Sequence, residues 1–328
     1  MEIAAYIDKA FHHKHLLTME DPEYRNWVFS FLFSILRSDK KDGDLTVSAI
    51  LSYSTRQMSA IITAKEDGII GGLEELMAFY TSQEITFTPK IEDGERITAN
   101  TEVAHLTGPI RKLLETERLG LDLLGRISGI ATKTNQIIAG MPKNVSTRIA
   151  ATRKTLWGLL DKKGVALGGG LTHRLGLWQA VLIKDNHIMA LKNMGYSDPF
   201  KDALYTSLPT LLSGKAAFFE IEVESMEETV SVAKNFLSLS AEKITRLNIS
   251  GVPLVILLDN FTPDDIKNTV KSLSDMSFRH RLILEASGGI SENNLMQYAD
   301  TGVDIISMGY LTHSVRSLNF SQTLVKSL

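Results

Sequence analysis

Two stretches, 217-AFFEIEVE-224 and 253-PLVILLD-259, decide the fold class of this chain. Each is a mostly apolar run of strand length, the first interrupted by three glutamates at every second position. The segment between them, from Met226 to Leu237, has the apolar spacing of a helix. Strands that are apolar along their whole length and alternate with helices are typical of a parallel sheet that is covered on both faces. We therefore expect an α/β fold here.

The same alternation extends in both directions along the chain. It consists of apolar runs at residues 145–152, 180–186, 281–287 and 303–308, and of helical patterns at residues 263–273 and 291–299. A closed (β/α) barrel and an open doubly wound sheet both fit it. We favour a barrel because chemically active residues end almost every strand, where a barrel collects its site. An open sheet would gather them at one switch point.

The part of the chain before residue 145 shows a different arrangement of predicted helices and strands. Residues 24–37 predict a buried helix, and residues 110–140 predict a long helix that links two domains. Short strand-like runs separated by glycine-containing turns lie between them, at residues 59–64, 68–73, 84–89 and 101–106. Two domains of different architecture are therefore expected.

Composition narrows the class of protein. The chain has 328 residues, of which 44% are hydrophobic and 22% charged, with a formal net charge of -3. It has no long Lys/Arg run, which argues against partners such as nucleic acid or an anionic membrane. The absence of cysteine excludes disulfides, thiolate metal sites and a cysteine nucleophile. With no signal-peptide pattern and no membrane-length apolar stretch, we expect a soluble, cytoplasmic protein.

Cationic side chains are concentrated in one window of this slightly acidic chain, residues 151–187. Single Arg and Lys residues are usually solvated, but a cluster beside strand-like and glycine-rich segments indicates a small polyanionic ligand. The cluster consists of Arg153, Lys154, His173, Arg174 and Lys184.

Carboxylates follow the cations along the chain. Glu220, Glu222 and Glu224 recur with period two, which places them on one face of a strand. Inside a closed sheet they would need cations or a metal; the alternative is that they face solvent on an edge strand. Asp259 ends the next strand, and we favour metal or hydroxyl binding over helix capping for it.

Glycines follow the last two strands. Ser287-Gly288-Gly289, with a helix expected to begin near Ser291, and Gly309 one unit later are typical of a backbone cradle for phosphate. Together with the cations and carboxylates, this cradle indicates a phosphorylated sugar handled with Mg²⁺. Such chemistry relies on electrostatic positioning and needs no protein nucleophile.

Ten short segments occur in the order found in one known family. They are 43-GDLT-46, 117-ER-118, 128-SGIAT-132, 152-TRKT-155, 169-GGLTHRLGL-177, 182-LIKDNH-187, 220-EIEV-223, 257-LLDN-260, 287-SGGI-290 and 311-LTHS-314. In these segments the chain resembles the quinolinate phosphoribosyltransferase family, also called nicotinate-nucleotide pyrophosphorylase (carboxylating). The resemblance covers roughly residues 43–316.

The resemblance implies a fold, an assembly and a reaction. The fold is an N-terminal α/β sandwich domain at residues 1–120, to which a tail at 316–328 returns, plus an incomplete TIM-like α/β barrel at 121–315. The assembly is a homodimer. The reaction transfers phosphoribose from phosphoribosyl pyrophosphate to quinolinate with Mg²⁺, giving nicotinate mononucleotide, CO₂ and pyrophosphate in NAD biosynthesis.

The resemblance also implies roles for the matched residues. The two quinolinate carboxylates would be held by Arg153, His173, Arg174 and Lys184, with Arg118 reaching in from the partner subunit. The 5′-phosphate would lie on Ser287, Gly288, Gly289 and Gly309, and Lys154 would contact the pyrophosphate-bearing substrate. Ribose and metal would lie on Glu222 and Asp259, so that the catalytic residues are Lys154, Lys184, Glu222 and Asp259.

The chain departs from the family pattern in several places. Leu156-Trp157 replaces a usual Pro-Gly, which leaves the conformation of that loop open, and Thr172 and Asp122 stand where asparagine is common. The segment 189–215 is longer than usual and is a candidate cover for the barrel mouth. His12, His13 and His15 suggest either a metal site or, as we favour, a solvated N-terminal helix.

Other functions fit parts of the pattern. One is a related type II phosphoribosyltransferase for nicotinate or another pyridine; a substrate associated with molybdenum uptake is disfavoured by the segment 183–187. A second is a Schiff-base aldolase that uses Lys184 as its nucleophile. A third is a non-catalytic phosphosugar-binding homologue.

Overall fold

The computed structural model describes residues 3–238, 248–249 and 251–325. It divides into two compact units, each assembled from separate stretches of chain. Unit 1 comprises residues 1–13, 137–154 and 170–310, and unit 2 comprises residues 14–136, 155–169 and 311–328. We expect a single domain boundary between residues 120 and 121, and that boundary stays a prediction. No helix in the described part is both long and apolar enough to span a membrane.

Unit 1 is built on a parallel sheet whose strands correspond to the six apolar runs. In spatial order they are β6 (Arg148–Ala150), β12 (Ile305–Ser307), β11 (Ile283–Ser287), β10 (Val252–Asp259), β8 (Phe219–Val223) and β7 (Val181–Ile183). A short β9 (Asn248–Ile249) pairs antiparallel with the start of β10. Among the described residues β6 does not pair with β7, so the barrel is incomplete, as expected.

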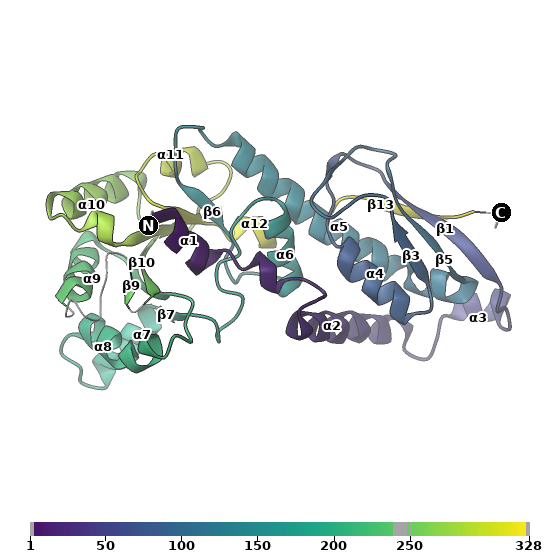
Figure 1. The fold of residues 1–328 in the computed structure, drawn as a ribbon, viewed down its shortest axis with the longest axis horizontal. Coiled ribbons are helices and arrows are strands. Elements are labelled where there is room, and N and C mark those ends of the chain that lie inside the picture. The colour runs from purple at the N-terminus through teal and green to yellow at the C-terminus, as the bar shows by residue number, and fades with distance from the viewer. Residues whose placement is uncertain (1–2, 239–247, 250, 326–328) are drawn as a thin grey trace. The chain divides into compact units, whose positions relative to one another are not determined.

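The helices of unit 1 follow the strands. They are α7 (Asp185–Asn193), α8 (Pro199–Leu212), α9 (Met226–Ser238), α10 (Pro263–Asp275) and α11 (Leu295–Ala299), while α12 (Tyr310–His313) lies at the boundary of the unit (Figure 1). The segment 189–215 forms the end of α7 and the whole of α8, which packs against α7 and α9.

The helix expected to begin near Ser291 begins four residues later. The side chain of Asn294 accepts a hydrogen bond from the Ser291 N–H at 2.8 Å and donates to the Gly289 carbonyl at 3.2 Å. The Asn294 side chain thus closes a local turn by bonding the Ser291 N–H and the Gly289 carbonyl, and this turn takes the place of the first turn of a helix. The expectation of a helix N-terminus directly after Gly289 is therefore wrong.

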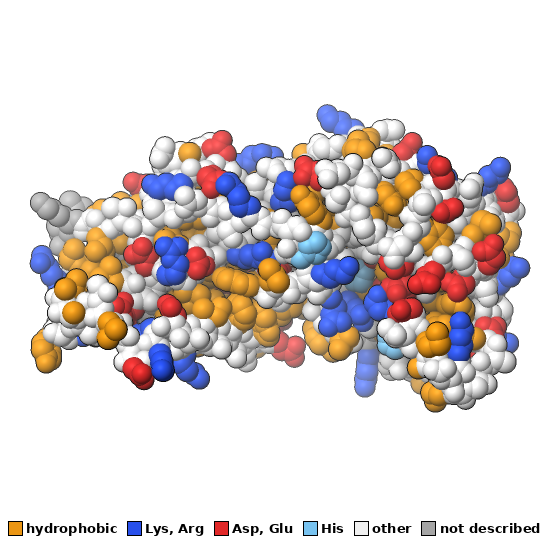
Figure 2. All heavy atoms as spheres, turned by 180° about the vertical axis from the view of Figure 1, so that it is seen from behind, with side chains coloured by type: hydrophobic (Ala, Val, Ile, Leu, Met, Phe, Trp, Pro, Cys, Tyr) orange, Lys and Arg blue, Asp and Glu red, His pale blue; other side chains and the backbone are white. Residues whose placement is uncertain are grey.

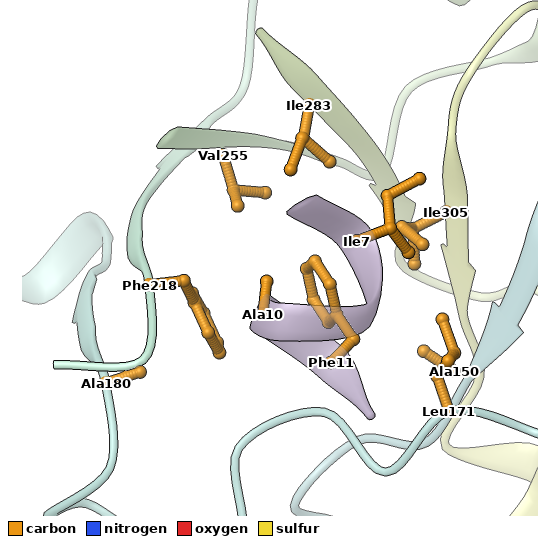
Figure 3. Close-up of a cluster of buried hydrophobic side chains, with 10 residues drawn as sticks. All are labelled: Ile7, Ala10, Phe11, Ala150, Leu171, Ala180, Phe218, Val255, Ile283 and Ile305. Atoms are coloured by element: carbon orange, nitrogen blue, oxygen red, sulfur yellow. The ribbon is translucent and has the colours of Figure 1, made fainter. Parts of the chain in front are cut away.

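The N-terminal helix α1 (Ile3–Phe11) lies inside unit 1. Its side chains Ile7, Ala10 and Phe11 are buried against residues near the amino-terminal ends of the strands, among them Val255 and Ile283. Figure 3 shows the helix surrounded by these side chains. The expectation of a solvated helix is wrong because an incomplete barrel leaves apolar surface at this end, and an amphipathic helix buries it.

Unit 2 contains an antiparallel sheet with the order β13 (Phe320–Val325), β1 (Gln57–Ala64), β5 (Glu102–Pro109) and β3 (Thr86–Pro89). The C-terminal segment thus pairs with β1. A separate ribbon joins β2 (Gly68–Ile69) to β4 (Arg96–Ile97). The helices are α2 (Pro22–Lys40), α3 (Leu45–Leu51), α4 (Leu73–Ser82) and α6 (Leu159–Leu167), with the 3-10 turn η1 (Lys14–Leu16).

Two expected helices are present in unit 2 with small differences. The long helix α5 (Ile110–Gly140) has the expected bounds. Helix α2 is fully buried only along one stripe, at Tyr24, Val28, Leu32 and Leu36, while its other apolar side chains, such as Trp27 and Phe31, are half-buried. The run at residues 68–73 forms only the two-residue β2 before α4 begins.

Buried charges stabilise unit 2. The guanidinium of Arg126 makes two hydrogen bonds of 2.9 Å to the Asp161 carboxylate. Asp161 also accepts from the backbone N–H groups of Leu156 and Trp157, at 2.8 and 3.1 Å. The Trp157 ring then contacts Phe31 edge to face, with centroids 5.5 Å apart. The loop that departs from the family pattern is thus held by one buried carboxylate and an aromatic contact.

Candidate active site

A cavity of about 430 Å³ lies at the carboxyl ends of the strands of unit 1. This is the end at which parallel α/β sheets place their ligands. Eight of the predicted site residues line it: Arg153, Lys154, His173, Arg174, Lys184, Glu222, Asp259 and Ser287. Thr152, Leu182, Leu257, Glu285 and Ser307 complete the lining.

All five cations of the predicted cluster reach this cavity. Arg153 and Lys154 follow β6, and Lys184 follows β7, where it is the residue before α7. His173 and Arg174 follow Leu171, which bridges to the end of β6. Figure 2 shows Lys and Arg side chains gathered beside acidic ones on unit 1. Folding therefore brings together residues that are up to 31 positions apart in sequence, from Arg153 to Lys184.

The surroundings of Arg174 favour a bound anion. Burial and the nearby positive charge of Arg153 lower the pKa of Arg174, while Glu220 acts in the opposite direction. A guanidinium remains charged even so, and two guanidinium groups that repel each other are both stabilised by a bound carboxylate or phosphate. This end of the cavity therefore suits a ligand with several negative charges.

The cavity lining also carries acids on adjacent strands. Parallel pairing aligns Leu257 of β10 with Glu222 of β8 and with Glu285 of β11, and aligns Asp259 with Ser287. Glu222 binds the Lys184 ammonium. Asp259 accepts a hydrogen bond of 2.6 Å from the Asn260 side chain.

The expectation of three inward carboxylates on β8 holds for two of them. Glu220 and Glu222 are buried, and β8 lies between β7 and β10, so the edge-strand alternative is wrong. Glu224 lies beyond the strand, is exposed, and its N–H donates to Glu228 ahead of α9. The period of two ends with the strand at Val223, so it does not carry Glu224 inward.

A second set of polar groups lies deeper in the barrel. His173 Nε2 is 3.3 Å from Glu285 Oε1 and 3.6 Å from Glu220 Oε2. Burial, reinforced by the neighbouring Glu285, raises the pKa of Glu220 well above its usual range. Sequence reasoning assigned Glu285 no role. The sequence does carry a signal for Glu285: it is an acid inside an apolar strand, two residues before Ser287 and hence on the same face of that strand.

The glycines after β11 have backbones that few other residues adopt. Gly288 and Gly289 have φ values of 96° and 59°. A Cβ on Gly288 would lie 2.3 Å from Asn260 Oδ1, whereas one on Gly289 would meet nothing within 4 Å. Both follow Ser287 at the cavity wall, and Gly309 comes two residues after Ser307, another wall residue. The phosphate-binding role of these glycines stays a prediction.

Arg118 belongs to a different part of the structure. It lies on α5 in unit 2, is exposed, and pairs with Asp122 at 3.5 Å. It lines a cavity of about 580 Å³ made wholly of unit 2 residues, including Asp39 and Trp157. A single subunit gives no test of its expected place in a partner's active site.

Comparison with known proteins adds independent evidence. The family model for the quinolinate phosphoribosyl transferase N-terminal domain matches residues 44–128, and the model for the C-terminal domain matches residues 130–323. Together they cover most of the chain, including every strand of unit 1.

Individual relatives agree with these matches. A probable nicotinate-nucleotide pyrophosphorylase (carboxylating) from Methanocaldococcus jannaschii is 34% identical over 307 residues, covering 92% of this chain and 99% of that protein. The Homo sapiens nicotinate-nucleotide pyrophosphorylase (carboxylating) is 32% identical, covering 85% and 86%. The crystal structure of NadC from Streptococcus pyogenes has 28% identity and a TM-score of 0.74, covering 92% and 97%.

Proposed function

The chain belongs to the quinolinate phosphoribosyltransferase family, and we propose that the cavity of unit 1 is the active site for its reaction. The protein is a phosphoribosyltransferase of NAD biosynthesis that converts quinolinate and phosphoribosyl pyrophosphate to nicotinate mononucleotide, CO₂ and pyrophosphate. The single observation that carries the site assignment is the pair Arg153 and Arg174. These like charges share one cavity wall, and the positive charge of Arg153 is one cause of the lowered pKa of Arg174.

The cationic wall binds the pyridine. Quinolinate carries two adjacent carboxylates on a planar ring, and planar guanidinium groups recognise carboxylates through paired hydrogen bonds. Arg153, Arg174 and Lys184 supply these contacts. The bound carboxylates are thereby fixed while the ring nitrogen bonds to the ribose C1 and the C1–O bond to pyrophosphate breaks. The carboxylate next to the ring nitrogen then leaves as CO₂, and a proton takes its place on the ring carbon.

The acidic residues of the cavity, Glu222 and Asp259, bind the ribose. Positive charge develops at C1 as pyrophosphate departs, and the carboxylates of Glu222 and Asp259 stabilise that charge. Lys154 contacts the departing pyrophosphate. Carboxylate oxygens are the donors that Mg²⁺ prefers, usually one or two together with substrate phosphates, so Glu222 and Asp259 also fit as its ligands. When bound, Mg²⁺ would neutralise charge on the pyrophosphate.

The loop after β11 binds the 5′-phosphate. Ser287 lines the cavity, Gly288 and Gly289 both have positive φ, and at Gly288 the chain comes close to Asn260 without a Cβ in the way. With Gly309, these residues supply small side chains and backbone N–H groups, which suit a phosphate group.

The assembly that we propose is a cytoplasmic homodimer. Arg118 is 71% exposed, and its one ion pair joins it to a neighbour that is itself half exposed. Exposed apolar side chains of unit 2, among them Leu45, Ile50 and Tyr53, would be covered by a second copy. In that dimer Arg118 contributes a further cation to the carboxylate site of the neighbouring subunit.

The deciding assay compares two pyridines. Purified protein is incubated with phosphoribosyl pyrophosphate and Mg²⁺, with either quinolinate or nicotinate, and the nucleotide is measured. We expect nicotinate mononucleotide and CO₂ from quinolinate only, and loss of activity in Lys184→Ala and Arg174→Ala. Turnover of nicotinate alone would overturn the substrate assignment. Borohydride trapping of substrate on Lys184 would instead support the aldolase, and binding of phosphoribosyl pyrophosphate without pyrophosphate release a non-catalytic homologue.

A further inference from the structure

The orientation of the His173 ring is set by the protein itself. Nδ1 accepts a hydrogen bond of 2.7 Å from the backbone N–H of Arg174. A neutral imidazole that accepts at Nδ1 carries its proton on Nε2. Nε2 faces Glu285 and Glu220, at 3.3 and 3.6 Å from their nearest oxygens. Both ring nitrogens are therefore directed at protein groups.

The two carboxylates below His173 need this donor. Glu220 and Glu285 are completely buried, and their oxygens have no hydrogen-bond partner of good geometry among the described residues. Buried acceptors are costly when unsatisfied, and Nε2 of His173 lies within 3.6 Å of an oxygen of each carboxyl group. The three residues do not suit a metal ion, because a metal needs the Nε2 lone pair and the bond at Nδ1 places the proton there.

The backbone around His173 is held as firmly as the ring. His173 has a φ of 54°, which is uncommon for a residue with a Cβ and persists where the surroundings enforce it. Its N–H donates to the Phe11 carbonyl at 3.1 Å, and the Thr172 hydroxyl donates to the same carbonyl at 2.8 Å. Thr172 also accepts from the His13 N–H at 3.0 Å. Helix α1 thus holds the backbone of residues 172–173, and the two glutamates lie beside Nε2 of the ring.

We propose that His173 is a positioning residue for Arg174 and does not itself bind the carboxylates of the substrate. Glu220 and Glu285 act through it, by keeping its ring turned so that Nδ1 meets the Arg174 N–H. The inference rests on the proposed function, since Arg174 is the group that contacts quinolinate. It revises the role that family resemblance gave to His173. Movement of Nε2–H toward a substrate would take the nearby donor away from Glu285, which lies 3.3 Å from it.

Two substitutions separate the roles of the ring nitrogens. In His173→Asn the side-chain oxygen can occupy the place of Nδ1 but cannot reach the glutamates, whereas His173→Gln reaches the place of Nε2 and loses the acceptor for Arg174. If His173 positions Arg174, the KM for quinolinate should stay within about threefold in His173→Asn and rise about 10- to 100-fold in His173→Gln. The KM for phosphoribosyl pyrophosphate should change in neither. Equal losses, or the reverse order, would overturn the proposal.

Matched controls guard against general damage. His12→Asn and His12→Gln make the same changes at an exposed histidine near the end of α1 and should leave both KM values unchanged. Should either His173 variant fail to fold, Glu285→Gln and Glu285→Leu replace the pair. Gln retains an acceptor for Nε2–H, so the KM for quinolinate should rise in Glu285→Leu and much less in Glu285→Gln. Equal KM values in these two variants would also refute the positioning role.

The tautomer can be measured without turnover. In protein labelled with ¹⁵N-histidine, the signals absent from His173→Asn belong to His173. We expect Nδ1 without a proton and Nε2 with one, both in the free protein and with saturating quinolinate. A proton on Nδ1, or a change of tautomer on adding quinolinate, would overturn the inference. Failure of the wild type to make nucleotide from quinolinate would instead refute the proposed function, and the tautomer of the free protein would still report on His173.

Discussion

Removal of the Phe11 side chain should destabilise unit 1 more than any exposed substitution. Phe11 is fully buried, and its ring lies 5.0 Å from the centroids of both Phe218 and His173. Truncation of a buried Phe to Ala typically costs about 3–5 kcal/mol, from lost apolar contact and the cavity that remains. We place Phe11→Ala in the upper half of this range, since two of the lost contacts are ring to ring.

The assay for Phe11→Ala is urea unfolding followed by circular dichroism. Leu45→Ala is the control, because Leu45 is 87% exposed and its replacement should change the free energy of unfolding by less than about 0.5 kcal/mol. The quinolinate KM of folded Phe11→Ala should also rise, since His173 loses one packing partner. A loss of less than about 1 kcal/mol would refute the conclusion that α1 completes the core of the barrel.

Three further predictions concern other parts of the chain. Burial raises the pKa of Glu75 to about 7, so the contribution of Glu75 to stability should fall as pH rises from about 4.5 to 7, because the unfolded state releases the proton first. Urea titrations should show a smaller fall in Glu75→Gln than in the wild type, and parallel curves for the two would contradict this prediction. Gly288→Ala should raise the KM for phosphoribosyl pyrophosphate at least tenfold and Gly289→Ala much less, because only a Cβ at residue 288 would meet Asn260, at 2.3 Å. Equal effects of the two substitutions on this KM would contradict the prediction. Asp161→Asn should cost about 3–5 kcal/mol in urea unfolding because it breaks the buried pair with Arg126, and the change should shift tryptophan emission; an unchanged midpoint would contradict it.

The local sequence pattern was sufficient to predict an element or a site residue where one physical cause dominates. The strands of unit 1 are mostly apolar because both faces are covered, so β10 is visible in the sequence as an uninterrupted run and β8 as a run interrupted only by Glu220 and Glu222. The cations Arg153 and Lys184 were found for a related reason: each directly follows such a run, and parallel strands bring their carboxyl ends together. Helix α10 was equally plain, with Thr262 as its N-cap and Pro263 as its first residue.

The apolar pattern was insufficient to place the exact ends of helices and strands. The helix start near Ser291 was wrong because the Asn294 side chain closes a turn in its place. Periodicity also placed Glu224 inside the barrel, although the strand ends one residue earlier. In both cases the end of the element is set by local hydrogen bonding, which apolar periodicity does not report.

The sequence by itself determined the α/β class, the family and the convergence of cations and acids, because these follow from apolar periodicity and from the ends of strands. Only the tertiary structure decided that α1 packs inside the barrel and that Glu285 lies beside His173. The physical reason is that both depend on contacts between segments more than a hundred residues apart. Such contacts are selected by the shape and polarity of the completed barrel, which no local stretch of the chain encodes.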